Sequence, residues 1–163
     1  MLFKKLIKMI RLVPKAYVSG FAFSSDFKVV TLIKKQKPLW QLGLLNAVNG
    51  RVCPGEFSLT AMCRKFFEET GAQTYLDQWK PLEVFIDEKI EISYFYCVLE
   101  DNQKPLTVTD EQIFNVYWQN YNHLDWQRLG VVSSVPYLIQ KAFCELTQSQ
   151  KDKILLESKV EEN

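Results

Sequence analysis

Residues 50–72 read GRVCPGEFSLTAMCRKFFEETGA, and this stretch decides the fold. It follows the pattern G-x5-E-x7-R-E-U-x-E-E-x-G-U, in which U is an apolar residue, at every fixed position but one. The matching residues are Gly50, Glu56, Arg64, Phe66, Glu68, Glu69, Gly71 and the small apolar Ala72. Lys65 breaks the pattern, because a glutamate is required there.

The second half of this stretch predicts a helix. Ser58 is a good N-cap before LTAMCRKFFEET, and Gly71 is the expected C-terminal stop. Residues three or four positions apart share a helix face, so Glu68, Glu69 and position 65 lie together. Carboxylates gathered on one face repel each other unless a cation neutralises them. Hard oxygen ligands of this kind suit Mg²⁺ or Mn²⁺, which also bind diphosphate oxygens.

The pattern is that of the Nudix pyrophosphohydrolases, and the chain resembles this family over about residues 15–145. The resemblance implies an α/β (α+β) fold with a mixed β-sheet sandwiched between helices. It also implies an enzyme that cleaves the pyrophosphate linkage of a nucleoside diphosphate derivative. The segment PLWQLGLLNAVNGRVCPGE (38–56) favours a (deoxy)nucleoside triphosphate as the substrate. ADP-ribose and nucleotide sugars stay open.

Roles for individual residues follow from the same resemblance. The implied ligands of Mg²⁺ (or Mn²⁺) are the carboxylates of Glu56, Glu68, Glu69 and Glu111. Asp110 is the rival of Glu111 in TDEQIFNVYW (109–118). Arg64 is expected to orient Glu68 or Glu69 by ion pairing.

The loop before the helix has its own implied role. Asn49 replaces the first glycine of the family's usual Gly-Gly pair, and its backbone carbonyl is expected to join the metal ligands. Gly50 and Gly55 allow a tight loop in which the backbone can approach phosphates. Asn49, Gly50 and Glu56 are therefore expected to contact the metal and phosphate groups.

Because Lys65 replaces the glutamate of the motif, three interpretations of the chemistry of the site stay open. A protonated lysine offers no electron pair to a metal, and its charge repels Mg²⁺. The enzyme could work with fewer metal ions, or the ammonium could replace a cation by pairing with Glu69 and touching a phosphate. In the third interpretation the domain binds nucleotides or acts as a regulatory or interaction module without turnover. We expect hydrolysis, with Lys65 among the catalytic residues.

Composition excludes several classes of protein. The 163 residues predict one Nudix domain at 15–148, between an N-terminal extension at 1–14 and a polar tail at 149–163. The net charge of +1 gives no basic field for nucleic acid. The four cysteines form no C-x-x-C pair and no metal-ligand spacing with His123, so a reduced cytoplasmic location is the simplest prediction.

Residues 1–13, MLFKKLIKMIRLV, are both apolar and basic. On a helix their lysines and arginine would fall on one side, opposite the apolar residues. Two interpretations stay open: weak contact with an anionic membrane surface or a partner, or packing on the domain itself. No apolar run is long enough to span a bilayer. Dimers are common in the family, so the resemblance leaves a homodimer open.

The rest of the chain predicts strands around two main helices. Strands are expected at 16–23, 28–35, 81–86, 90–100 and 113–120. A second helix is expected at 135–148, with Pro136 in its first turn, and the polar stretch beyond it is expected to fray or to extend as a loose helix. The aromatic residues could stack on a base, but packing is the simpler interpretation, so no base-reading residue is predicted.

Overall fold

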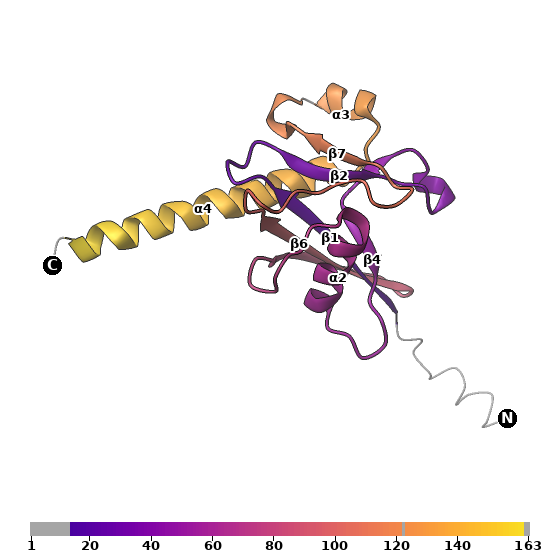
Figure 1. Ribbon diagram of the computed structural model, residues 1–163, viewed down its shortest axis with the longest axis horizontal. Helices are drawn as coiled ribbons and strands as arrows, with labels where there is room; N and C mark the ends of the chain where they lie inside the picture. The colour runs from indigo at the N-terminus through magenta and orange to yellow at the C-terminus, as the bar shows by residue number, and fades with distance from the viewer. Residues whose placement is uncertain (1–13, 122, 162–163) are drawn as a thin grey trace.

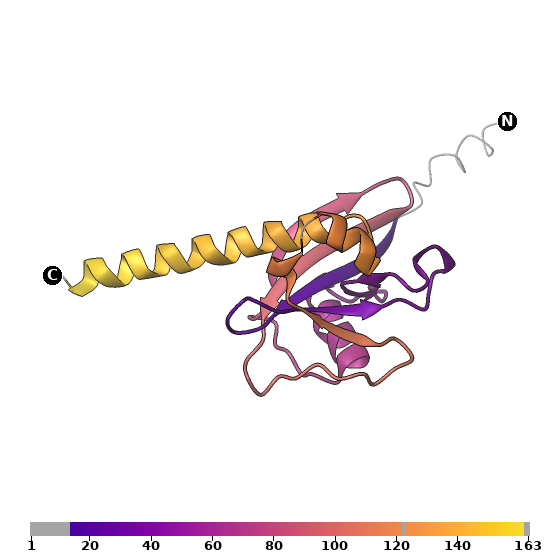
Figure 2. The same cartoon turned by 90° about the horizontal axis from the view of Figure 1, so that it is seen from above.

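The computed structural model describes residues 14–121 and 123–161, so the predictions for residues 1–13 lie outside the described part. Figures 1 and 2 show a β-sheet domain from which one long helix projects. The strands are β1 (Lys15–Phe23), β2 (Val30–Lys34), β3 (Leu45–Asn46), β4 (Val48–Arg51), β5 (Lys80–Ile86), β6 (Ile90–Val98) and β7 (Ile113–Val116). The helices are η1 (Leu39–Gln41), α2 (Ser58–Thr70), η2 (Trp118–Asn120), α3 (His123–Leu129) and α4 (Val135–Glu161).

Within the described residues the seven strands form one mixed sheet, in the order β3-β2-β1-β6-β5, with β4 also paired to β1 and β7 to β2. β1 and β6 are parallel over their whole length, from Lys15 opposite Ile90 to Phe23 opposite Val98. The other named strand pairs are antiparallel. The expected mixed sheet between helices is thus confirmed.

Strand β1 lies at the centre of the sheet and is covered on both faces. Its residues from 18 to 23 are all buried, as expected for a strand with layers on both sides. Val18 and Ala22 pack with Met62 and Phe66 of α2, and other β1 side chains pack towards α4. Figure 2 shows α2 and α4 on opposite sides of the sheet.

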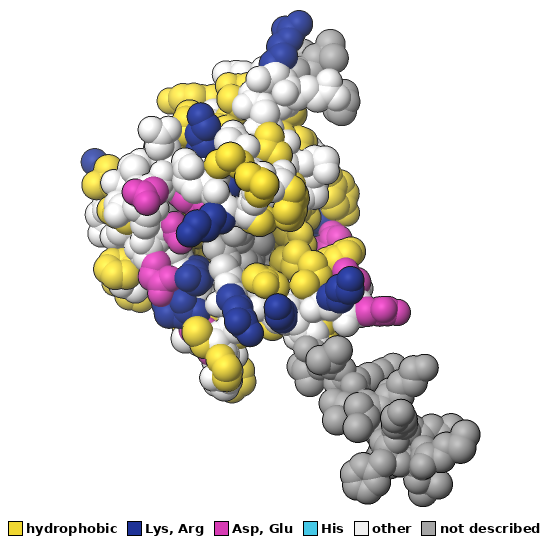
Figure 3. Space-filling model, turned by 90° about the vertical axis from the view of Figure 1, so that its right-hand side faces the viewer, with side chains coloured by type: hydrophobic (Ala, Val, Ile, Leu, Met, Phe, Trp, Pro, Cys, Tyr) yellow, Lys and Arg dark blue, Asp and Glu magenta, His cyan; other side chains and the backbone are white. Residues whose placement is uncertain are grey.

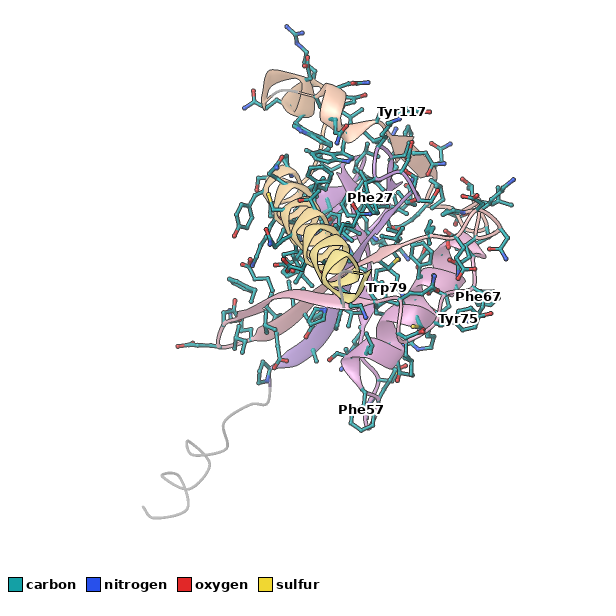
Figure 4. The ribbon with its side chains drawn as sticks, turned by 90° about the vertical axis from the view of Figure 1, so that its left-hand side faces the viewer. Phe27, Phe57, Phe67, Tyr75, Trp79 and Tyr117 are labelled. Atoms are coloured by element: carbon teal, nitrogen blue, oxygen red, sulfur yellow. The ribbon has the colours of Figure 1, made fainter. Side chains whose placement is uncertain are left out.

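Helix α2 is held on the sheet by its apolar face. Phe66 is fully buried and contacts Trp79 edge to face, with ring centroids 5.3 Å apart. Phe57 and Phe67 are exposed and point away from this core, whereas Trp79 lies within it (Figure 4). The opposite face of α2 is therefore left for polar chemistry.

The ends of α2 test two predictions. Gly71 ends the helix in the left-handed conformation with φ 68°, as predicted. The N-cap prediction is wrong: the cap residue is Phe57, with φ −77° and ψ 143°, and it makes no side-chain capping bond. Ser58 is already helical, so its hydroxyl is past the cap position.

Other boundaries also differ from the sequence predictions. β2 starts only at Val30, because a turn between Ser24 and Val29 includes Phe27 at φ 61°. β7 ends at Val116, and η2 replaces the rest of the predicted strand. The polar stretch from His123 to Leu129, for which no element was predicted, forms α3.

The C-terminal helix is longer than its apolar pattern predicted. α4 runs for 27 residues, to Glu161, so the polar stretch extends the helix, which is one of the two outcomes expected for it. In Figure 1 it extends well past the sheet. Among the helices of the described residues, none has the length and apolar character needed to cross a bilayer.

Candidate active site

Arg64 is the centre of an ion-pair network on the polar face of α2. Its Nε and Nη2 donate to the two carboxylate oxygens of Glu56, each at 2.7 Å, and Nη2 also donates to the Arg51 carbonyl at 3.1 Å. Glu56 accepts a further bond from the Cys53 N–H at 2.9 Å. The Arg64 and Cys53 bonds lower the pKa of Glu56 to about 2. Arg64 thereby holds the loop before α2 against the helix.

Glu68 is bound by two cations. Arg64 Nη1 donates to Oε1 at 3.0 Å, and Lys65 Nζ donates to Oε2 at 2.6 Å. The Lys65 bond is the main cause that lowers the pKa of Glu68, and the Arg64 bond adds to it. The expected pairing of Arg64 with a motif glutamate is observed at Glu68. The expected Lys65–Glu69 pair is wrong, because the ammonium reaches Glu68 at i+3 instead.

Lys65 also packs against the strand before the motif. A β-carbon added to Gly50 would lie 2.5 Å from Lys65 Cε and 2.6 Å from its Cγ, closer than real contacts. Gly50 lies in β4 without a positive φ, whereas Gly55 has φ 79° and forms the turn that was predicted. A β-carbon at position 50 would thus force the Lys65 stem or β4 to move, so this position is restricted by the approach of Lys65 and not by a turn.

Glu69 has a different environment from Glu68. Thr109 Oγ1 donates to its carboxylate at 3.3 Å, and the same hydroxyl accepts the Glu111 N–H at 3.1 Å. Thr109 therefore connects α2 to the segment before β7. No described cationic side chain forms an ion pair with Glu69.

Glu111 lies near this network, but both of its carboxylate oxygens are bonded elsewhere. Lys35 Nζ lies 2.7 Å from Oε2, and the Gln36 N–H donates to Oε1 at 3.0 Å. Lys35 is buried, with only 6% of its surface exposed. Asp110 is exposed. A metal-ligand role for Glu111 or Asp110 stays a prediction.

The donor set fits Mg²⁺ only in part. Glu69 and the Asn49 carbonyl are hard oxygen donors, as this ion requires. Glu56 and Glu68 are already neutralised by Arg64 and Lys65. In the described part of the chain, no three acidic, His or Cys side chains are grouped closely enough to hold a metal ion. Of the predicted carboxylate ligands, Glu69 is therefore the one that no described cation pairs with.

A pocket of about 640 Å³ adjoins the motif, and Asn49 forms part of its wall. It is bounded by β1, β3, β4, β6, η1 and the segment before α4. Its lining residues are Tyr17, Val18, Ser19, Lys37, Pro38, Trp40, Gln41, Asn46, Asn49, Ile90, Ile92, Tyr94, Val132 and Ser134. Its volume is typical of sites for small organic ligands.

Two carboxamides in the pocket wall have a defined orientation. Asn46 Oδ1 accepts the Ala47 N–H at 2.8 Å, so Asn46 Nδ2 must point the other way. It donates to Gln41 Oε1 at 3.2 Å. Gln41 Nε2 consequently remains as a donor, with no acceptor among the described residues. The Gln41 carboxamide is thus left with an N–H donor in a residue of the pocket wall.

The side of the molecule drawn in Figure 3 carries several Lys and Arg side chains around exposed hydrophobic ones. Lys37 and the 70% exposed Trp40 belong to the pocket. Positive charge beside an apolar surface suits a ligand that combines a ring with phosphates.

Sequence reasoning identified the motif residues but not the pocket. Ser19 and Tyr94 come together only because β1 and β6 pair in parallel. No local sequence pattern predicts this pairing. Gln41 and Asn46 lie in a segment that was noted only for its family likeness. Trp40 was among the aromatic residues considered for stacking, and the structure places it in the pocket wall.

Comparison with known proteins agrees with this architecture. A family model described as NUDIX domain matches residues 14–140, which is more than half of the chain. The chain therefore belongs to the Nudix family. No curated protein sequence matches it.

Solved structures share the fold at low sequence identity. The NUDIX domain of Shewanella oneidensis NrtR, complexed with ADP ribose, has a TM-score of 0.62 and 14% identity, over 90% of this chain and 99% of that one. A MutT structure from a study of Aliivibrio salmonicida and Vibrio cholerae has a TM-score of 0.57 and 21% identity, over 72% and 98%. A MutT/nudix family protein from Enterococcus faecalis has a TM-score of 0.55 and 14% identity. The match covers 70% of this chain but only 49% of that protein's chain.

Proposed function

We propose that this Nudix protein hydrolyses the pyrophosphate linkage of a nucleoside triphosphate, with the nucleoside in the pocket and the phosphates beside α2. One observation carries the proposal: the pocket and the motif share strand β4. Asn49 lines the pocket, and Gly50 lies directly under Lys65 of α2. Because consecutive strand residues face opposite sides of the sheet, a ligand longer than the pocket would pass the edge strand β4 to reach the carboxylates of α2.

The network around Arg64 supports a positioning role for that residue. It holds Glu56 and Glu68 in fixed places, at 2.7 and 3.0 Å. Glu69 and the Asn49 carbonyl would hold a Mg²⁺ ion together with the nucleotide phosphates. The ion, when bound, would polarise the phosphorus and neutralise charge on the leaving group.

Glu69 is the best-placed carboxylate to take a proton from water. It is half-buried, and its described hydrogen bond comes from Thr109, a neutral group that leaves a negative charge available. In the proposed reaction a water oxygen bonds to phosphorus as one bridging P–O bond breaks. The water proton goes to the carboxylate, and the products are a nucleoside monophosphate and pyrophosphate.

A nucleotide panel with Mg²⁺ or Mn²⁺ tests this function. We expect release of pyrophosphate from at least one nucleoside triphosphate, and loss of that activity by about a hundredfold or more in Glu69→Gln. Glu88→Gln is the matched control, because Glu88 is exposed on the loop between β5 and β6. Full activity of Glu69→Gln would place the reaction elsewhere.

A second candidate function is nucleotide binding without turnover. This function is favoured by the ion pairs of Arg64 and Lys65 with Glu68, because they occupy a carboxylate that the family resemblance implies as a metal ligand. The relative from Shewanella oneidensis, crystallised with ADP ribose, adds this compound to the panel. A ligand-induced rise in the melting temperature with no product, for every nucleotide tested, would support binding alone.

The cysteines bear on the location of the protein in the cell. All four cysteines are free of disulfides, which supports a reducing compartment such as the cytoplasm. A homodimer stays a prediction, and analytical ultracentrifugation would test it.

A further inference from the structure

We propose that Lys65 stands in for a divalent metal ion at Glu68 and binds the phosphate end of the nucleotide with its own charge. The inference rests on the proposed function, since it assumes that phosphates lie beside α2. It assigns a chemical role to Lys65, the residue that departs from the motif. The protein would then take up fewer metal ions than a chain with glutamate at this position.

The charges around Glu68 support this role. Glu56 and Glu68 contribute two negative charges, and Arg64 and Lys65 contribute two positive ones, so the four side chains are neutral together. Lys65 Nζ lies 2.6 Å from Glu68 Oε2, so its positive charge occupies the position at this oxygen where a metal cation would bind. A Mg²⁺ ion brought to Glu68 would have to displace the ammonium or lie beside it, and like charges repel.

The position of the ammonium is defined by packing as well as by charge. The Lys65 stem lies against the backbone of Gly50, and only 22% of the side chain is exposed. A surface lysine usually samples many rotamers, and ordering it loses conformational entropy. Here the contact with β4 has already ordered the stem, so less freedom is lost when a phosphate binds.

The location suits a phosphate oxygen. Asn49 lines the pocket, and Lys65 packs on the next residue, Gly50, from the other side of the edge strand β4, so a phosphate chain that passes this edge would meet the ammonium. Lysine is a point charge with three donors, so one ammonium can hold Glu68 and still donate to a phosphate. The nucleotide should therefore bind measurably in the absence of any divalent ion.

Two titrations test this proposal on the full chain. Mn²⁺ binding, followed by electron paramagnetic resonance without nucleotide, should increase by about tenfold in affinity, or by one ion, in Lys65→Glu. Binding of a non-hydrolysable nucleoside triphosphate analogue in EDTA should weaken by about tenfold in Lys65→Met. Methionine keeps most of the stem that packs on Gly50, so this variant removes the charge with little change in packing.

Lys141→Met and Lys141→Glu are the matched controls. Lys141 forms a comparable ion pair with Glu83 at 2.8 Å, but on α4. Neither control should change Mn²⁺ or analogue binding. The proposal is overturned if Lys65→Glu binds Mn²⁺ like the wild type, or if Lys65→Met binds the analogue as tightly as the wild type does.

Failure of the proposed function gives a different result. In one outcome the wild type neither binds nor hydrolyses any nucleotide, while Lys65→Glu gains Mn²⁺. The proposed function is then wrong and the role of Lys65 in phosphate binding is overturned, although Lys65 still excludes a metal ion from Glu68. If the wild type hydrolyses a nucleotide but Lys65→Met binds the analogue unchanged, the function stands and the role of Lys65 is wrong. Melting curves of each variant confirm that it is folded.

Discussion

Lys65 packs its aliphatic stem directly against Gly50, and a β-carbon on that glycine would lie 2.6 Å from Lys65 Cγ. This contact joins α2 to β4, the strand that enters the motif. The glycine that begins the motif is consequently in tight contact with a side chain fifteen positions later. The same contact aims the Lys65 ammonium at Glu68, 2.6 Å away.

The first prediction concerns this contact. Gly50→Ala should lower the free energy of unfolding by about 1–3 kcal/mol, because the new methyl group forces the Lys65 stem or β4 to move. Urea denaturation measures the loss. Lys65→Ala removes the stem, so the double variant should be less destabilised than the two single changes added together. Strict additivity would mean that Gly50 is needed for another reason.

The second prediction concerns pH. The Arg64 and Cys53 bonds lower the pKa of Glu56 from its ordinary 4.5 to about 2 in the folded protein. Its ionised form therefore stabilises the fold above about pH 4.5, and this contribution is lost as the pH falls towards 2. The lowered pKa of Glu68 acts with the same sign.

We therefore expect Glu56→Gln to be less stable than the wild type at pH 7, by a difference that shrinks as the pH approaches 2. Denaturation curves at several pH values measure it. Glu88→Gln, at an exposed position, should follow the wild type throughout. A difference that stayed constant down to pH 2 would contradict the ion-pair explanation.

The third prediction separates a structural from a catalytic role for Glu111. Lys35 is buried and pairs with Glu111 at 2.7 Å, so Glu111→Gln leaves a buried charge without its partner. The expected loss of stability is about 3–5 kcal/mol. Lys35→Met combined with Glu111→Leu should recover most of it.

Activity of that double variant then decides the role of Glu111. A recovered fold with normal hydrolysis means that Glu111 is structural. A recovered fold without hydrolysis means that Glu111 takes part in the chemistry, as the family resemblance implies. Unchanged stability of Glu111→Gln would contradict the buried pair itself.

The fourth prediction concerns base selectivity. Gln41 and Asn46 present N–H donors to the pocket, and an oxo group at a base edge is the matching acceptor. Analogues of GTP or UTP should bind about fivefold more tightly than those of ATP, which carries an amino group at the equivalent edge. Calorimetry with the three analogues measures this.

Gln41→Glu replaces a donor by an acceptor and should remove or reverse the preference. Gln140→Glu is the control, because Gln140 is exposed on α4 and lies outside the pocket. An unchanged ratio between the analogues in Gln41→Glu would exclude Gln41 from base recognition.

Local patterns determined much of the fold. Gly71 ends α2 because only a residue without a β-carbon adopts φ 68° easily, and this can be predicted from the letter alone. The buried strands were found by their β-branched and aromatic residues. The ends of elements were less predictable: Val116 ends β7 and Phe57 caps α2, and neither residue type marks the end of an element by itself.

The sequence by itself determined the motif, the family resemblance and the misfit at Lys65, because each depends only on the order of residues. Tertiary structure alone decided which partner each charge has. Glu68 rather than Glu69 binds Lys65, and Glu111 binds Lys35, because the packing of Lys65 on Gly50 and the burial of Lys35 set where each ammonium lies. Long side chains can reach several partners, and only contacts between distant segments select one of them.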